Sequence, residues 1–343
     1  MTEQQVALFR DPNRLPGTPA PLPQGPPWRR FGTQRPDKPP YVIRQEDVDI
    51  VNTALHLRRP LLVTGYPGVG KSSLAHALAD DLGLGEVLHW PVNSRTQLAD
   101  GLYRYDAVAR LREAAAENAA AGTAVERYIT LGPLGTALSA AAGKPRVLLV
   151  DELDKGDIDL PNDLLTVFEE GVFEIPELRR QADSGGTESV KVRLTRPAPR
   201  VTAAHTAEGT PQTGPAEDER AHVVDGWVRC EEFPVVVITS NGEREFPPAF
   251  LRRCVRLFLG DPDRKHLEKV VHAQFRTELD EADDTTIATV EDLIGQFSVA
   301  GRDGRLATDQ LLNAIHLRLS NAALDPHVLE AVLRPLDEID PVT

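Results

Sequence analysis

The sequence predicts an α/β fold, in which a parallel sheet is flanked by helices and is followed by a small, purely helical domain. Between about residues 41 and 260, short runs rich in Val, Leu and Ile alternate with longer amphipathic stretches. Such runs are typical of strands buried on both faces, and their alternation with helical patterns indicates a parallel sheet. From about residue 261 the apolar periodicity is helical throughout.

The individual elements follow from the same patterns. Residues that interrupt regular secondary structure flank each apolar run. Strands are therefore expected at residues 60–65, 86–92, 145–152 and 233–241. Helical spacing between the strands predicts helices within 71–84 and 160–171. In the C-terminal part, helices are expected at 263–275, 289–297, 308–319 and 326–336.

Composition indicates how the chain is divided into segments and in which compartment the protein is expected. We expect a proline-rich arm at 1–40, an α/β domain at 41–260 and a helical lid at 261–343. The arm is either an unstructured tail or a segment that lies on a neighbouring surface, anchored by Trp28 and Phe31. Cys230 and Cys254 are expected to be reduced thiols. Without a long apolar run or a signal-peptide pattern, a cytoplasmic protein is expected.

A polar insertion between about residues 179 and 232 interrupts the α/β pattern. Residues 181–189 and 207–220 are poor in apolar side chains and are expected to be polar loops. The alternating run SVKVRLT at 189–195 predicts a strand that belongs to a hairpin. Residues 89–111 are interpreted as a strand, a loop and a surface helix, with a partner-contacting loop at 94–106 as the alternative.

Residues 65–72 match the pattern G-x-x-x-x-G-K-[ST] of a phosphate-binding loop. Glycines allow backbone N–H groups to approach phosphate oxygens closely, and the lysine supplies a charge for the β- and γ-phosphates. The helix that begins near the lysine directs its positive end at the same anion. The expected nucleotide-binding residues are Gly65, Pro67, Gly68, Val69, Gly70, Lys71, Ser72 and Ser73.

An acidic pair at the end of a buried strand predicts the second half of this site. Asp151 and Glu152 follow the run at 147–150, and ligands of α/β sheets bind at the carboxyl ends of the strands. Asp151 is expected to hold Mg²⁺ together with the Ser72 hydroxyl. Glu152 is expected to be the general base that activates water. The pair favours hydrolysis over phosphoryl transfer to another substrate.

Three further polar side chains remain ambiguous from their local sequence. Asn241 ends a buried strand, where its amide could bind the γ-phosphate or the attacking water, but it also precedes Gly242 in a strong turn dipeptide. Arg252 and Arg253 are either surface charges or fingers that reach the nucleotide of a neighbouring subunit.

Together these motifs resemble the AAA+ ATPases in order and spacing over residues 41 to 330. Within that superfamily the chain resembles the MoxR branch in the runs GYPGVGKS, VDELDKGD, LLTVFEEGVFEIPE and SNGEREFPPAFLRRC. The resemblance implies that Asn241 senses the γ-phosphate and that Arg253, or its neighbour Arg252, is the trans-acting finger. It implies a second sensing arginine at Arg305, with Arg302 as the alternative. It also implies a hairpin at 168–180.

The resemblance implies a Mg²⁺-dependent ATPase that assembles into a ring-like homo-oligomer, with a hexamer expected, and that remodels or activates a partner protein. Partners in that branch are often von Willebrand A-domain proteins. Two alternatives stay open: a GTP- or ATP-driven motor of a nucleic-acid-directed defence complex, similar to McrB, and a nucleotide-gated assembly switch. The net charge of −14 argues against direct contact with nucleic acid, and no membrane contact is expected.

Overall fold

A five-stranded parallel sheet lies at the centre of the computed structural model, which describes residues 25–29, 39–116, 124–185, 189–195, 220–300, 306–320 and 330–334. The strand order is β11-β1-β10-β5-β2, so every connection crosses over a helix or a longer excursion. The α/β class predicted from the apolar runs is confirmed. The strands are β1 (Leu61–Gly65), β2 (Leu88–Pro91), β5 (Val147–Asp151), β10 (Val235–Ser240) and β11 (Val255–Leu259).

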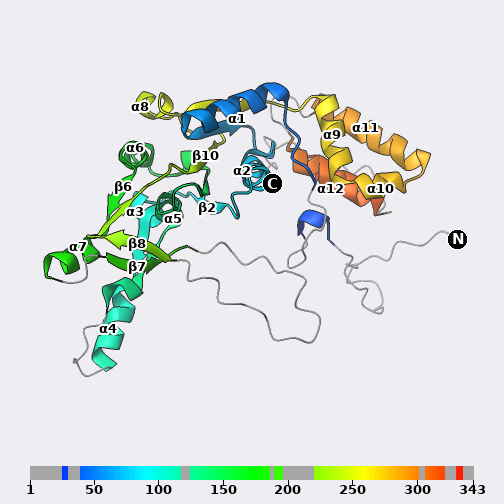
Figure 1. Ribbon diagram of the computed structural model, residues 1–343. Helices are drawn as coiled ribbons and strands as arrows, with labels where there is room; N and C mark the ends of the chain where they lie inside the picture. The colour runs from blue at the N-terminus through cyan, green and yellow to red at the C-terminus, as the bar shows by residue number, and fades with distance from the viewer. Residues whose placement is uncertain are drawn as a thin grey trace, which may run out of the picture.

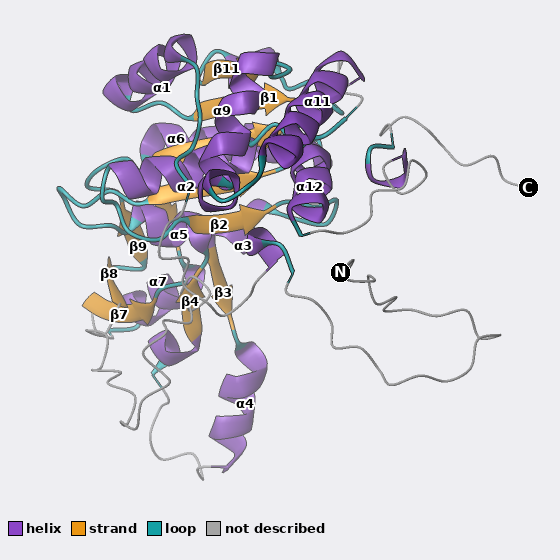
Figure 2. Ribbon diagram, turned by 90° about the vertical axis from the view of Figure 1, so that its right-hand side faces the viewer, coloured by secondary structure: helices purple, strands orange, loops and turns teal. Residues whose placement is uncertain are grey.

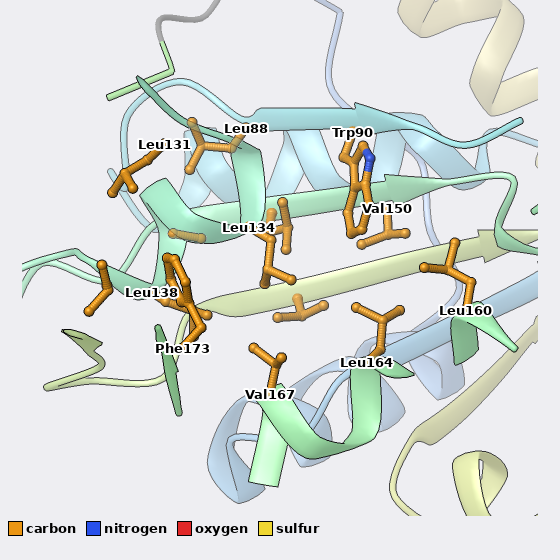
Figure 3. Close-up of a cluster of buried hydrophobic side chains, with 14 of the residues drawn as sticks. Leu88, Trp90, Leu131, Leu134, Leu138, Val150, Leu160, Leu164, Val167 and Phe173 are labelled. Carbon is orange, nitrogen blue, oxygen red and sulfur yellow. The ribbon is translucent and has the colours of Figure 1, made fainter. Parts of the chain in front are cut away.

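Both faces of the sheet are buried, which is why the strands are apolar at almost every position. Leu148 and Val150 point into one hydrophobic cluster, while Val147 and Leu149 point into another on the opposite face. Figure 3 shows the first cluster, in which the indole of Trp90 packs among leucine and valine side chains of the sheet and the neighbouring helices.

Helices cover the sheet on each side. Helices α1 (Gln45–Leu57) and α2 (Lys71–Asp81) contribute to one cluster, and α5 (Pro133–Leu138) and α6 (Leu160–Glu170) contribute to the other. Local signals delimit α6: a proline stands at its start and Gly171, with φ of 62°, ends it. The remaining helices of this part are η2 (Val125–Tyr128), η3 (Leu153–Lys155), α3 (Leu98–Leu102), α4 (Ala107–Ala116), α7 (Pro176–Asp183) and α8 (Pro248–Leu251). Helix α4 projects away from the body in both views (Figures 1 and 2).

A second sheet has the order β3-β4-β7-β8-β9-β6. Its strands are β3 (Tyr103–Tyr105), β4 (Ile129–Leu131), β6 (Val172–Glu174), β7 (Ser189–Arg193), β8 (Arg220–Val224) and β9 (Trp227–Arg229). The hairpin strand predicted at 189–195 is confirmed, because β7 pairs antiparallel with β8. The hairpin expected within 168–180 is wrong: β6 pairs instead with β9, more than fifty residues later, and helix α7 follows it.

The predicted polar insertion is therefore partly strand. Residues 181–183 end α7, and the insertion supplies three strands of the second sheet. Residues 186–188 and 196–219, which include most of the two polar segments, lie outside the described residues. The stretch at 89–111 contains a strand, a short helix, a further strand and the start of α4, close to the interpretation as strand, loop and helix.

The C-terminal helices pack around a hydrophobic cluster of their own (Figure 1). They are α9 (Arg264–Gln274), α10 (Arg276–Asp280), α11 (Asp284–Ala300) and α12 (Thr308–Leu319). Of the helix expected at 326–336, only residues 330–334 are described. We call this unit the lid.

A short piece of the proline-rich arm lies against the lid of the same chain. Helix η1 (Pro27–Arg29) carries Trp28, whose ring centroid is 5.9 Å from those of Phe275 and His316 in edge-on geometry. This contact matches the interpretation of Trp28 as an anchor. Phe31, the other expected anchor, lies outside the described residues.

Two further expectations concern the thiols and the membrane. Cys230 and Cys254 are both free thiols. In the described part of the chain, no helix is both long and apolar enough to cross a membrane.

Candidate functional site

The turn between β1 and α2 is shaped by glycines in conformations that other residues avoid. Gly68 and Gly70 have φ of 77° and 91°, and Gly70 directly precedes the first residue of α2. A Cβ on Gly68 would lie 2.5 Å from the Cβ of Ala307 in the lid. The loop therefore needs glycine for its backbone geometry and for close approach of the lid.

Lys71 places a buried positive charge inside this loop. Its Nζ donates hydrogen bonds of 2.8 Å to the backbone oxygens of Gly65 and Tyr66, and the residue is 7% exposed. Burial lowers the pKa of Lys71, and the negative charges of nearby carboxylates, with that of Asp154 the most effective, oppose the shift. A buried ammonium with spare donor capacity is suited to binding an anion.

Asp151 joins the loop to the neighbouring strands. The hydroxyls of Ser72 and Thr239 donate to its Oδ1 over 2.7 and 2.6 Å, and His89 Nε2 lies 3.2 Å from its Oδ2. Burial opposes ionisation of this carboxyl, but the hydrogen bonds from His89, Thr239 and Ser72 outweigh it and lower the pKa of Asp151 to about 2. The group is therefore an anion at neutral pH.

Glu152 and Asn241 also meet at this edge of the sheet. Glu152 has a left-handed backbone conformation with φ of 60°, and its N–H donates to the Thr239 hydroxyl over 2.8 Å. Its Oε1 lies 2.9 Å from the ammonium of Lys155 and 3.5 Å from Asn241 Nδ2. The structure thus brings together two side chains that are 89 positions apart.

The remaining predicted loop residues contribute in different ways. Pro67 and Ser73 are exposed, while Val69 packs against the cluster beneath α2. Tyr41, in the segment before α1, covers the other side of the loop and donates through its hydroxyl to Gly70 O over 3.3 Å. Burial, with the charge of Asp47, raises the pKa of Tyr41 to about 12, so it remains a donor at neutral pH.

The two candidate fingers follow the short helix α8. Arg253 is engaged within its own chain, since its Nε contacts the Glu169 carboxylate and its Nη1 donates to Ala249 O over 3.1 Å. The side chain of Arg252 is exposed and forms no ion pair with the residues that the structure describes. Arg302 and Arg305, proposed for the lid sensor, lie outside the described residues.

The donor set fits a magnesium-bound nucleotide. The oxygens of Ser72 and Asp151 are 2.7 Å apart, and hydroxyl and carboxylate oxygens are the donors that Mg²⁺ prefers. A glycine cradle, a buried ammonium and a helix N-terminus at the same place are suited to phosphate oxygens. Ser72 and Asp151 can therefore hold the metal, and the backbone of 65–72 can hold the phosphates.

Several residues of the site escaped the sequence analysis. Thr239, His89, Lys155 and Asp154 contact the predicted residues, although the expected motifs do not include them. A signal existed for two of them: Thr239 follows four apolar residues of a buried strand, and Asp154 is a third acid in the run VDELD. Their roles depend on contacts that the sequence does not display.

Comparison with known proteins places this site in a family. No curated protein matches the chain. Among solved structures, NtrX from Brucella abortus in complex with ADP is similar, with 16% identity, a TM-score of 0.43 and coverage of 87% of this chain. The match covers 56% of NtrX, so the present chain spans little more than half of its length.

A family model for the AAA domain of the dynein-related subfamily matches residues 60–254, which is more than half of the 343 residues. The matched range begins just before β1 and ends just before β11, so it includes the phosphate loop, the acidic pair and Asn241. AAA domains are P-loop modules that bind ATP with Mg²⁺ and hydrolyse it. The chain is a P-loop ATPase and belongs to the AAA domain family, dynein-related subfamily.

Proposed function

We propose that this ATPase is an oligomeric machine of the MoxR type, in which the residues described above hydrolyse ATP and the released energy remodels a partner protein. One observation carries the catalytic part. The hydrogen bond between Ser72 and Asp151, 2.7 Å long, joins the phosphate loop to the acidic strand end, with Glu152 and Asn241 beside it.

Each side chain has a distinct role in this proposal. When bound, Mg²⁺ supplies positive charge that neutralises the phosphates, and Ser72 and Asp151 hold it. Lys71 binds the β- and γ-phosphates. Glu152 orients the attacking water and takes its proton, and Asn241 fixes the position of Glu152 and of the γ-phosphate.

The Glu152 carboxylate forms an ion pair with Lys155. The Lys155 ammonium lies 2.9 Å from Glu152 Oε1, so this carboxylate oxygen is already engaged by a donor within the chain. Both side chains are about two-fifths exposed, which leaves Lys155 room to move away. Glu152 is then available to water once Lys155 withdraws.

The oligomeric part of the proposal depends on the arginines. Arg252 is exposed without an ion pair in the described part of the chain, whereas Glu169 holds Arg253. We therefore propose that Arg252 enters the site of a neighbouring copy. AAA ATPases typically oligomerise, and we propose a ring of identical subunits. The remodelling role and a von Willebrand A-domain partner are supported by the sequence resemblance to the MoxR branch.

Two substitutions test the catalytic assignment. Lys71→Ala should weaken ATP binding by at least about tenfold, because hydrogen bonds to charged groups contribute about 1.5–3 kcal/mol each. Glu152→Gln should leave binding nearly intact and lower kcat by about 10²–10⁴-fold, since the amide cannot accept the proton of water. Calorimetry measures binding, and phosphate release measures turnover.

The exposed residues Lys265 and Glu170 offer matched controls, Lys265→Ala and Glu170→Gln, which should behave as wild type. Tight ATP binding by Lys71→Ala, or normal turnover by Glu152→Gln, would contradict the assignment. Hydrolysis should require Mg²⁺, should be faster with ATP than with GTP, and should not be affected by added DNA. A preference for GTP with stimulation by DNA would instead favour the defence-complex alternative.

A further inference from the structure

Asp154 is a buried acid that the proposed chemistry does not use. It lies in helix η3, three residues after Asp151, and is 3% exposed. Its Oδ2 accepts hydrogen bonds from the backbone N–H groups of Asn241 and Glu243, each 3.0 Å long. Its Oδ1 is also buried and has no hydrogen-bond partner among the described residues.

The two bonds to Asp154 hold the turn that carries Asn241. Strand β10 ends at Ser240, and the chain then bends at Gly242, which has φ of 79°. The Ser240 hydroxyl accepts from Gly242 N over 3.0 Å, so three consecutive N–H groups of this turn are bound by side chains. The turn is therefore fixed by side chains and not by sheet pairing.

The side chain of Asn241 is held much less firmly than its backbone. Among the described residues, its amide contacts Glu152 Oε1 alone, at 3.5 Å, the outer limit of a hydrogen bond. Because this contact is weak, the position of the amide is set mainly by the backbone to which it is attached. Asp154 controls that backbone.

The N–H groups of Asn241 and Glu243 need an acceptor, which an apolar residue at position 154 would not supply. Burying a carboxyl group with one unpartnered oxygen costs free energy, and the two hydrogen bonds to the turn offset that cost. The contacts of Asp154 are thus directed at the turn that carries Asn241.

We propose that Asp154 is a positioning residue for hydrolysis, which holds the turn at 241–243 so that the Asn241 amide stays beside Glu152. Residues 151–155 then act as one rigid segment that carries the metal ligand, the base and the support of the sensing amide. This inference rests on the roles proposed above for Glu152 and Asn241.

Amide hydrogen exchange tests the geometric part without any nucleotide. In Asp154→Ala, the amides of Asn241 and Glu243 lose their acceptor and should exchange at least about tenfold faster than in wild type. Asp163→Ala, which removes an exposed acid from the nearby helix α6, should leave their exchange unchanged. Unchanged exchange in Asp154→Ala would overturn the proposal.

A double-mutant cycle tests the catalytic part. Asp154→Ala should lower kcat by about 10–100-fold while the Kd for ATP changes by less than about threefold, since misplacement of a reacting group reduces rate more than binding. Asn241→Ala should also lower kcat. The double variant should be no slower than Asn241→Ala alone, within about threefold, because both changes remove the same contribution.

Asp154→Asn keeps an acceptor oxygen and should retain more activity than Asp154→Ala, which distinguishes positioning from a general loss of stability. If Asp154→Ala does not fold, the same cycle is measured with Asp154→Asn. Multiplicative losses in the double variant would overturn the proposal while leaving the ATPase assignment intact. Normal turnover by Glu152→Gln would instead contradict the proposed function itself, so the two failures are distinguishable.

Discussion

At the scale of single residues, Asp151 shows how neighbours prepare a side chain for its role. Two hydroxyls and one imidazole face its two oxygens, and they come from three different elements. These contacts offset the cost of partial burial and keep the carboxyl ionised far below neutral pH. The same contacts must also contribute to the stability of the fold.

This environment predicts an acid-dependent stability. Because the pKa of Asp151 falls from 3.8 to about 2 on folding, the group stabilises the native state by about 2 kcal/mol above pH 3.8. That contribution is lost as the pH falls through about 2. Without nucleotide and Mg²⁺, Asp151→Asn should therefore be less stable than wild type at pH 7, and the difference should shrink below about pH 4. Denaturant titrations measure it, with Asp163→Asn as the control. A difference independent of pH would contradict the assigned cause.

At the scale of elements, the phosphate loop is shaped by contacts on two sides. Tyr41 lies against Gly70, where an added Cβ would meet its ring at 3.4 Å. On the other side, Ala307 of the lid approaches Gly68. The loop thus lies between the segment before α1 and the lid, so a nucleotide held there can influence the position of both.

Two glycines with similar backbone conformations allow the effect of backbone strain to be distinguished from the effect of steric contact with the lid. Gly68 and Gly83 have φ of 77° and 63°, but a Cβ at Gly83 would meet nothing within 4 Å. Both alanine variants should lose about 1–2 kcal/mol of stability through backbone strain. Only Gly68→Ala should also weaken ATP binding, because its methyl group would displace the lid at Ala307. Adding Ala307→Gly should restore part of that loss. Equal effects of Gly68→Ala and Gly83→Ala on binding would show that the lid contact is unimportant.

At the scale of the whole molecule, the site is asymmetric. The phosphate loop and the acidic pair lie at the carboxyl edge of the sheet, while Arg252 follows α8 and is free of ion pairs within the described part of the chain. In a ring, one subunit would present its loop and the next its arginine. A complete site would then exist only between subunits.

Mixing two inactive variants tests this arrangement. Subunits with Arg252→Ala keep a functional loop, and subunits with Lys71→Ala keep a functional arginine, so mixed rings should contain some complete interfaces. Hydrolysis should therefore exceed that of either variant alone, while Arg252→Ala by itself binds ATP normally and turns over at least about 10³-fold more slowly. Arg253→Ala, tested in parallel, assigns the finger. Co-assembled variants that recover no hydrolysis would count against a shared site, and so would a fully active monomer.

The central sheet and the lid were more predictable from the sequence than the second sheet. Four of the five central strands and the helices α9, α11 and α12 of the lid were predicted, because each shows its burial as a local pattern of apolar residues, whereas β11 and α10 were missed. The second sheet was mostly missed, since its strands are three to five residues long and pair across large gaps in sequence, as β6 does with β9. Most of these strands bury only every second residue, so they show too little apolar pattern to be recognised, whereas the central strands of similar length are apolar at almost every position.

The phosphate loop, the acidic strand end and the α/β class could be predicted from the amino-acid sequence alone. In each case the chemistry requires adjacent residues, whose spacing is therefore visible in the chain. The folded structure was needed to show that Thr239 and His89 support Asp151, that Lys155 and Asn241 face Glu152, and that Asp154 holds the Asn241 turn. Most of these contacts join residues that lie on neighbouring strands or shortly after them and that are more than sixty positions apart. Their partners are set by the order and register of the parallel strands, which depend on packing of the whole sheet.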